Sequence, residues 1–597
     1  MARSRFLLAA TLLVALPSRF LFAADVPASP TSKIPTEENA VELPTVTITD
    51  SKILPLPEAW RYAKYDGFEI LSNASDHETR QLLRDFVVFR QALSLAWPIE
   101  SRESLPVTLI LCGKENKFDD FVDRPIGAEP NRASLLLKDL DRISIVIDLQ
   151  RKAVTLSAVD SSAGAATTDA GAGTFDVDHH SLLYREYVKF LLSRSDPPLP
   201  AWLQEGLAQI VMAMEFTPNS VIFGRIGERG QGGSSAPKGG LATTSEDESD
   251  TAEQSVPDLD FNLALTRQRL LPFHAFFDVK PDSPVAQNVV GNTRWSKQAY
   301  AFVHLCLYGE GGRYQKAFLT LAQRASRGPL TEEIFKDCFG KSYDKMLLEL
   351  RGYIEMTDYK YQQFKIKGQG FFQPPALDLR DASDAEVGRI KGDAFRAAHR
   401  LPQAHDALAA AYLRGERDPA LLGALGLYEA TAGNAARAQK FLEAAAKAKI
   451  TRPTVYLEEA RLLYAEALAH PGTVQGQFSS EQAITILRPL FATRNQSPPL
   501  AEVYELIADT WSHCVIQPKR EHLAVLSEGV KLFPRHSELV FKTAALNAKS
   551  GYFDTAATVA ALGEQAASDP ATKTRFQALV ATFPKPDAKT STSEAKP

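Results

Sequence analysis

The chain has 597 residues, more than one hydrophobic core usually organises, so we expect several domains. Its composition is 45% hydrophobic and 23% charged, as in ordinary globular proteins, and its formal net charge is −5. No basic run stands out, which argues against nucleic-acid binding, and four scattered cysteines do not indicate a disulfide scaffold.

Residues 1–24 have the features of a secretory signal peptide. Arg3 and Arg5 precede an apolar run at 6–16 that is too short to span a bilayer, and two alanines at 23–24 offer a cleavage zone. This predicts a periplasmic or secreted bacterial protein with no transmembrane segment after signal removal. A retained N-terminal membrane anchor is the alternative. Residues 25–55 are rich in Pro, Thr and Ser and predict a flexible lead-in.

The next part of the chain alternates strand-like and helix-like patterns. Helical periodicity at 78–93 predicts a helix, and apolar, β-rich runs predict strands around it. The predicted strands are 68–73, 105–113, the segment ASLLLKD and 142–149. Together these elements predict a small mixed α/β unit.

From 181 to 356 the patterns are mainly helical. We expect helices at 181–194, from Pro200 onward, and at 295–309, 314–326 and 331–356. A polar stretch rich in Gly and Ser at 227–258 predicts a disordered insertion between them.

Beyond about residue 384 alanine density rises and strand patterns vanish. The segments 419–448 and 539–566 each predict two helices joined by a tight turn. Such pairs resemble tetratricopeptide repeats, which stack into a superhelix, over 384–570. A non-repeating α-bundle is the alternative. The polar tail at 584–597 predicts disorder.

A short motif carries the argument about function. In R-E-Y-V-K, Arg185 and Lys189 are four residues apart and share a helix face. Glu205 follows 16 residues after Lys189, within P-A-W-L-Q-E-G-L-A-Q, and a further segment reads S-K-Q-A-Y-A-F-V-H-L-C. In order and spacing these three segments resemble the gluzincin zinc peptidases, and more narrowly the peptidase-MA-like domains of secreted bacterial proteins.

The resemblance assigns a role to each matching position. It places Arg185 and Lys189 where the family has its two zinc-binding histidines, Glu186 at the position of the catalytic base, and Glu205 at the third metal ligand. It implies a peptidase-MA-like domain over 56–356, apart from the insertion. The motif-flanking positions are Trp202, Gly206, Gln298 and His304.

The departures from the family pattern decide the functional prediction. Arginine has no lone pair for a metal and lysine is normally cationic, so no metal and no cofactor are expected. We predict that Arg185 and Lys189 replace the cation and pair with Glu205 and Glu186. In D-V-D-H-H (176–180), the one dense His/Asp cluster, Asp178 is predicted to cap the helix rather than to bind metal. His304 and His274 are predicted to be hydrogen-bonded core residues.

The fold class is therefore predicted as α+β: a small mixed α/β unit and a mostly helical zincin-like domain, followed by an all-α repeat domain. The predicted function is a pseudo-metallopeptidase that binds a protein or peptide through its old cleft and its repeats. One alternative is an active zinc peptidase with an unconventional metal site and Glu186 as the base. Another is an envelope scaffold that works through its repeats alone. The ligand and the oligomeric state do not follow from the sequence.

Overall fold

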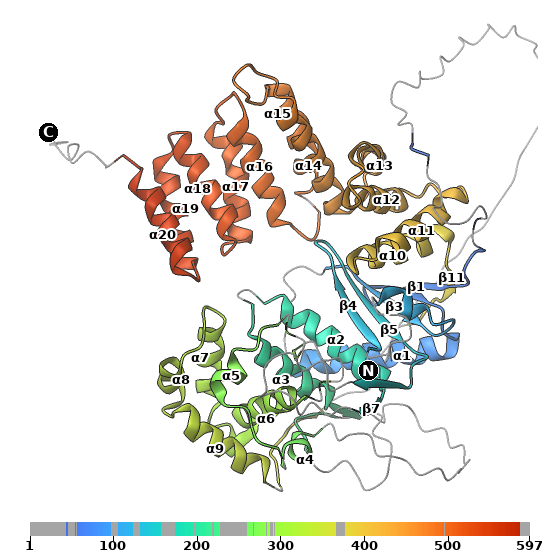
Figure 1. Ribbon diagram of the computed structural model, residues 1–597, viewed down its shortest axis with the longest axis vertical. Helices are drawn as coiled ribbons and strands as arrows, with labels where there is room; N and C mark the ends of the chain where they lie inside the picture. The colour runs from blue at the N-terminus through green and yellow to red at the C-terminus, as the bar shows by residue number, and fades with distance from the viewer. Residues whose placement is uncertain are drawn as a thin grey trace, which may run out of the picture. The chain divides into compact units, whose positions relative to one another are not determined.

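A six-stranded mixed sheet organises the N-terminal part of the chain (Figure 1). The strand order is β11-β1-β2-β3-β5-β4; β2, β3 and β5 run parallel, and the other neighbouring pairs are antiparallel. The strands are β1 (Arg61–Tyr65), β2 (Phe68–Ser72), β3 (Val107–Cys112), β4 (Ser134–Lys138), β5 (Ile143–Asp148) and β11 (Arg380–Asp381). The computed structural model describes residues 43–45, 54, 56–96, 105–122, 132–156, 173–195, 198–217, 220–226, 260–266, 268–281, 283, 285–286, 291, 293–356, 358–365, 376–494 and 496–584.

Both faces of this sheet are buried. Side chains alternate across a strand, so Leu109 and Leu111 of β3 lie on one face and Ile110 on the other. The first face packs against α1 (Asp76–Ala96) and α2 (His179–Ser193). The second packs against α10 (Asp384–Ala397) and the start of α11 (Leu401–Leu413). The helices that follow residue 384 therefore begin against the sheet.

A second core, rich in aromatic rings, surrounds α6 (Arg294–Tyr308). It includes Trp202, Phe273, Phe302 and Phe335, all almost completely buried. The helices of this part are α3 (Ala201–Met212), α4 (Phe261–Leu265), α5 (Phe273–Phe277), α7 (Gln315–Ala325), α8 (Glu332–Phe339) and α9 (Tyr343–Ile354). The remaining described strands form two small sheets: β6 (Ala153–Leu156) pairs with β7 (Gly173–Asp176), and β9 (Ser220–Phe223) lies between β8 (Glu215–Thr217) and β10 (Gln362–Lys365).

The rest of the described chain is helical. The helices are α12 (Pro419–Thr431), α13 (Ala435–Lys447), α14 (Pro453–Ala469), α15 (Ser480–Ala492), α16 (Ala501–His513), α17 (Arg520–Leu532), α18 (Ser537–Lys549), α19 (Phe553–Ala566) and α20 (Pro570–Ala581). Gly433 and Gly551 adopt positive φ angles of 83° in the turns of the pairs α12/α13 and α18/α19. Glycine takes this conformation at little cost, which explains the two tight turns.

The predicted fold class is confirmed at the level of a mixed chain, with a small sheet in its N-terminal region and helices in its C-terminal region. Strand β1 was not predicted, and neither was its pairing with β11 about 320 residues later. The predicted signal peptide, the insertion at 227–258 and the tail from 585 lie outside the described residues. In the described ranges, no helix combines the length and the apolar character needed to cross a membrane.

Candidate functional site

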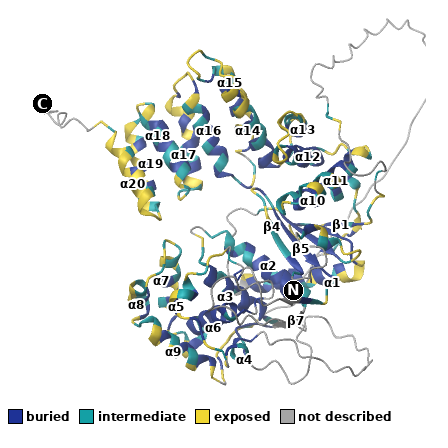
Figure 2. Cartoon of the chain, in the orientation of Figure 1, coloured by how far each residue is buried: buried dark blue, intermediate teal, exposed yellow. Residues whose placement is uncertain are grey.

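The two helices of the motif lie next to each other at the boundary between the two cores. Helix α2 begins at Asp178, whose carboxylate accepts a hydrogen bond from the backbone N–H of His180, as the N-cap prediction requires. Helix α3 begins after Pro200, whose fixed φ suits the entry to a helix. Figure 2 shows α2, α3 and α6 as mostly buried, so polar side chains on their facing sides need partners within the protein.

Arg185 and Glu205 form the centre of the site. Nη2 of Arg185 lies 2.9 and 3.1 Å from the two carboxylate oxygens of Glu205, and the two side chains are 1% and 2% exposed. Gln209, one turn further along α3, donates a hydrogen bond of 3.0 Å to the same carboxylate. The predicted pairing of Arg185 with Glu205 is confirmed.

Lys189 extends this centre toward the surface. Its Nζ lies 3.6 Å from Glu205 and 3.4 Å from the carbonyl oxygen of Ala286, and its side chain is 20% exposed. Deeper in the protein, Nζ of Lys297 donates to Oε1 of Gln209 at 3.2 Å. Two cations thus approach Glu205 directly, and a third approaches it through Gln209.

The electrostatics of the site favour an ionised Glu205. Burial disfavours the charged carboxylate, but the charges of Arg185 and Lys189 and the hydrogen bonds outweigh it and lower the pKa of Glu205 to about 2. Burial, together with the nearby charge of Arg185, lowers the pKa of Lys189, although the carboxylates of Glu205 and Glu186 oppose that change. Glu205 therefore remains a carboxylate anion that is already saturated by donors.

Glu186 has a different hydrogen-bond partner from Glu205. It is 7% exposed and accepts a hydrogen bond of 2.9 Å from the hydroxyl of Ser134, the first residue of β4. The charge of Glu186 still opposes the lowering of the pKa of Lys189, and its pairing with Arg185 and Lys189 stays a prediction. Adjacent residues of a helix point about 100° apart, so the side chain that follows Arg185 faces the sheet instead of α3.

The motif-flanking residues hold the helices together. Gly206 allows α3 to approach α6 closely, because a Cβ there would lie 2.4 Å from Val303 Cγ2 and 2.6 Å from the carbonyl oxygen of Ala299. Trp202 lies against Phe277 and Phe302, with ring centroids 5.3 and 5.6 Å away. Each has a packing role that accounts for its presence without any chemistry.

Gln298 and His304 of α6 fix two neighbouring chain segments. The amide of Gln298 accepts from the N–H of Leu271 at 2.7 Å and donates to its carbonyl at 2.9 Å. Nε2 of His304 donates to the carbonyl of Gly224 at 2.6 Å, which leaves Nδ1 to accept from the hydroxyl of Tyr353 at 2.8 Å. Burial lowers the pKa of His304 to about 4, so this histidine is a neutral core residue as predicted.

Two further histidines of the sequence argument, His180 and His274, lie in different environments. His180 lies between two carboxylates, 3.3 Å from Asp85 and 3.7 Å from Asp178. His274 is exposed on the short helix α5, so the prediction that it is a core residue is wrong. Phe273 and Phe276 take the inward positions of that helix.

The side chains at the motif do not fit a zinc ion. Two of the three positions that the resemblance assigns to metal ligands carry arginine and lysine, and the third is already held by them. Within the described ranges, no group of three or more His, Cys, Asp or Glu side chains is arranged to hold a metal.

Ser134, Gln209 and Lys297 were not predicted from the sequence. The spacing of Gln209 four residues after Glu205 was an available signal, because such residues share a helix face. Ser134 and Lys297 reach the site only through the tertiary fold.

No protein-family model, curated protein or solved structure matches the chain.

Proposed function

We propose that this chain is a metal-free relative of the gluzincin peptidases that binds a protein or peptide instead of cleaving one. The observation that carries this proposal is the salt bridge between Arg185 and Glu205. It engages the carboxylate at the position of the third metal ligand and brings a permanent cation to it. Glu186, at the position of the base, accepts a hydrogen bond from the hydroxyl of Ser134.

The C-terminal helices support the binding part of the proposal. The pairs α12/α13 and α18/α19 have the helix–turn–helix plan of tetratricopeptide-like repeats, whose stacked helices present a surface to protein or peptide ligands. We place the protein in the bacterial periplasm or outside the cell, on the signal-like residues 1–24.

The decisive experiment measures metal content. The full chain is loaded with zinc, desalted and analysed, and its activity on casein is assayed with and without added zinc. We expect well under 0.1 equivalent of zinc and no hydrolysis. Near-stoichiometric zinc that disappears in Glu205→Gln, together with casein cleavage, would establish the active-peptidase alternative and overturn the proposal.

A further inference from the structure

The turn between β4 and β5 carries an unusual density of charge. Within Asp139–Arg142 three of four side chains are ionisable, and the backbone closes tightly, with the N–H of Asp139 donating to the carbonyl of Arg142 at 2.9 Å. Leu140 at its tip is exposed, but Asp141 is only 2% exposed. A hairpin turn at a free sheet edge normally points its charges into water, so these charges are directed at something else.

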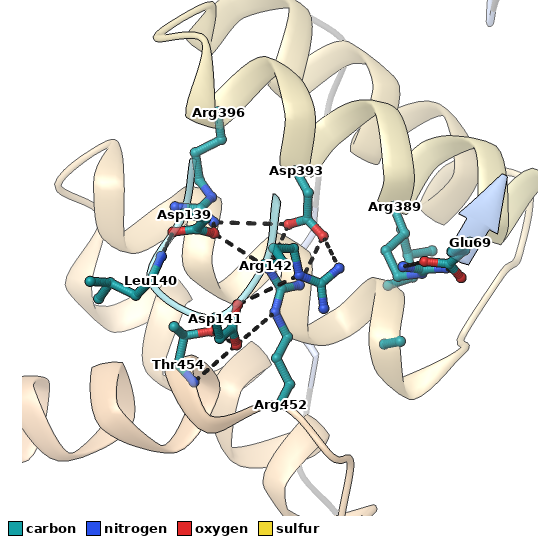
Figure 3. Close-up of polar contacts among 12 residues, drawn as sticks. Glu69, Asp139, Leu140, Asp141, Arg142, Arg389, Asp393, Arg396, Arg452 and Thr454 are labelled. Carbon is teal, nitrogen blue, oxygen red and sulfur yellow. Dashed lines mark hydrogen bonds and ion pairs between the residues drawn. The ribbon is translucent and has the colours of Figure 1, made fainter. Parts of the chain in front are cut away.

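Their partners come from two helices of the C-terminal region (Figure 3). Arg142 donates to Asp393 of α10 at 2.9 Å, and Arg396 of α10 pairs with Asp139. Arg452, the N-cap of α14, binds both oxygens of Asp393 at 2.8 and 3.0 Å.

Asp141 caps α14 from outside the helix. Its Oδ2 accepts hydrogen bonds from the backbone N–H of Thr454 at 3.2 Å and from the Thr454 hydroxyl at 2.5 Å. The first N–H groups of a helix have no partner within the helix, and a carboxylate there also interacts favourably with the helix dipole. A side chain of the sheet region thus completes a helix more than 300 residues later in sequence.

The network is balanced in charge and withdrawn from water. Three aspartates (139, 141 and 393) face three arginines (142, 396 and 452), and Asp393 and Arg452 are 4% and 3% exposed. Burial works against both charges, but the opposite charges lower the pKa of Asp393 and raise that of Arg452. Removing one member would leave a buried charge without its counter-ion.

Apolar packing joins the same elements. Ile390, Ala394 and Phe395 of α10 share one buried cluster with Ile110 and Val146 of the sheet. Nearby, Arg389 of α10 pairs with Glu69 of β2 at 3.0 Å. The sheet region and the first C-terminal helices therefore share both a hydrophobic core and an ionic network.

We infer that the ionic contacts of the Asp139–Arg142 turn couple the sheet to helices α10 to α14, so that these elements unfold as one cooperative unit. The boundary predicted from the sequence at residue 384, where the repeat-like region begins, then separates two sequence patterns but not two folding units. Cutting the chain there would expose one face of the sheet and leave Asp141 and Arg142 without their helix partners.

The test is hydrogen exchange of the full chain with Arg452→Met. We expect the rate of amide exchange in β3, β5, α10 and α14 to rise at least about 100-fold. The factor should be the same in all four elements. The matched control is Arg461→Met, also in α14, whose side chain is 41% exposed and pairs with Glu458 of the same helix. It should change exchange less than about threefold.

A milder variant keeps the inference testable if Arg452→Met does not fold. Thr454→Val removes the hydroxyl that donates to Asp141 but keeps the shape of the side chain. It should raise exchange about tenfold in the same four elements. A rise confined to α14 and the turn, with β3 and β5 unchanged, would overturn the inference.

Discussion

Nη2 of Arg185 spans the two carboxylate oxygens of Glu205 across the interface of α2 and α3, at 2.9 and 3.1 Å, in a site that water scarcely reaches. A buried pair of this kind need not add net stability over an apolar pair, because both charges lose their hydration. Loss of one partner is a different matter, since the remaining charge stays buried.

Glu205→Ala should therefore lower the free energy of unfolding by about 3–5 kcal/mol, because Arg185 and Lys189 lose their shared anion. Urea unfolding of the full chain followed by circular dichroism measures the change. The control is Glu310→Ala, which removes an exposed glutamate whose partner Arg313 is also exposed, and should cost less than about 1 kcal/mol. Equal midpoints for the two variants would contradict the structural role of Glu205.

The same carboxylate gives a pH window. Its pKa is about 2 in the folded chain against an ordinary value of 4.5, so it is depressed by folding. The stability that it contributes is present above pH 4.5 and is lost as the pH falls through 2. The difference in unfolding free energy between the natural chain and Glu205→Gln should shrink over this interval. A difference independent of pH from 5 to 2 would contradict the assignment.

Replacing both cations by histidine tests the resemblance directly. In Arg185→His/Lys189→His, two imidazoles four residues apart on α2 would face Glu205, which completes a three-ligand zinc set. We expect about one equivalent of zinc after loading and desalting, and a rise in thermal stability with added zinc. Adding Glu205→Gln should abolish both effects. A folded double variant without zinc would show that α2 and α3 do not have the peptidase geometry.

Helical spacing and the family resemblance together predicted part of the site, and the rest depended on distant parts of the chain. The four-residue interval predicted that Arg185 and Lys189 share a face, and both lie near Glu205. The partner of Glu186 could not be predicted, because Ser134 lies 52 residues earlier on a strand. Adjacent side chains on one helix diverge by about 100°, so Arg185 and Glu186 reach different elements, α3 and β4.

The fold was predictable where patterns were strong and uninterrupted. The apolar runs gave β3 and β5 correctly, and the long helical periods gave α1, α2 and α6. The apolar runs of β3 and β5 also indicated that both faces of the sheet are covered. All six residues of Val107–Cys112 and of Ile143–Asp148 are buried, and a strand that is apolar on both faces requires cover on both. That cover is α10, which is distant in sequence.

His180 should make the stability of the chain fall in mild alkali. Burial disfavours its charged form, but hydrogen bonds and charges from Asp178 and Asp85 raise its pKa to about 9, above the ordinary 6.5. A raised pKa gives stability that is present below pH 6.5 and lost as the pH rises through 9. We expect this term to be on the order of 1–2 kcal/mol, since the side chain is partly exposed.

Unfolding of His180→Gln at pH 6 and pH 9.5 measures this term. The variant should be less stable than the natural chain at pH 6 and nearly equal to it at pH 9.5. His77→Gln is the control, because His77 is exposed in the first turn of α1. A His180→Gln penalty that is the same at both pH values would rule out a charged His180.

Gly206→Ala tests whether the W-L-Q-E-G-L-A segment is retained for packing. A Cβ at this position would lie 2.4 Å from Val303 Cγ2 and 2.6 Å from a backbone oxygen, and the backbone of α6 cannot shift easily. We expect a loss of about 1–3 kcal/mol in unfolding free energy by urea titration, with no change in zinc content.

Gly352→Ala is the matched control, since Gly352 also lies in a helix, α9, but has open space at its Cβ. It should stabilise the chain by up to about 1 kcal/mol, because alanine favours helix. If both variants were stabilising, α3 and α6 would not pack as closely as Gly206 permits. The position of Glu205 relative to Arg185 and Lys189 would then differ from the one described.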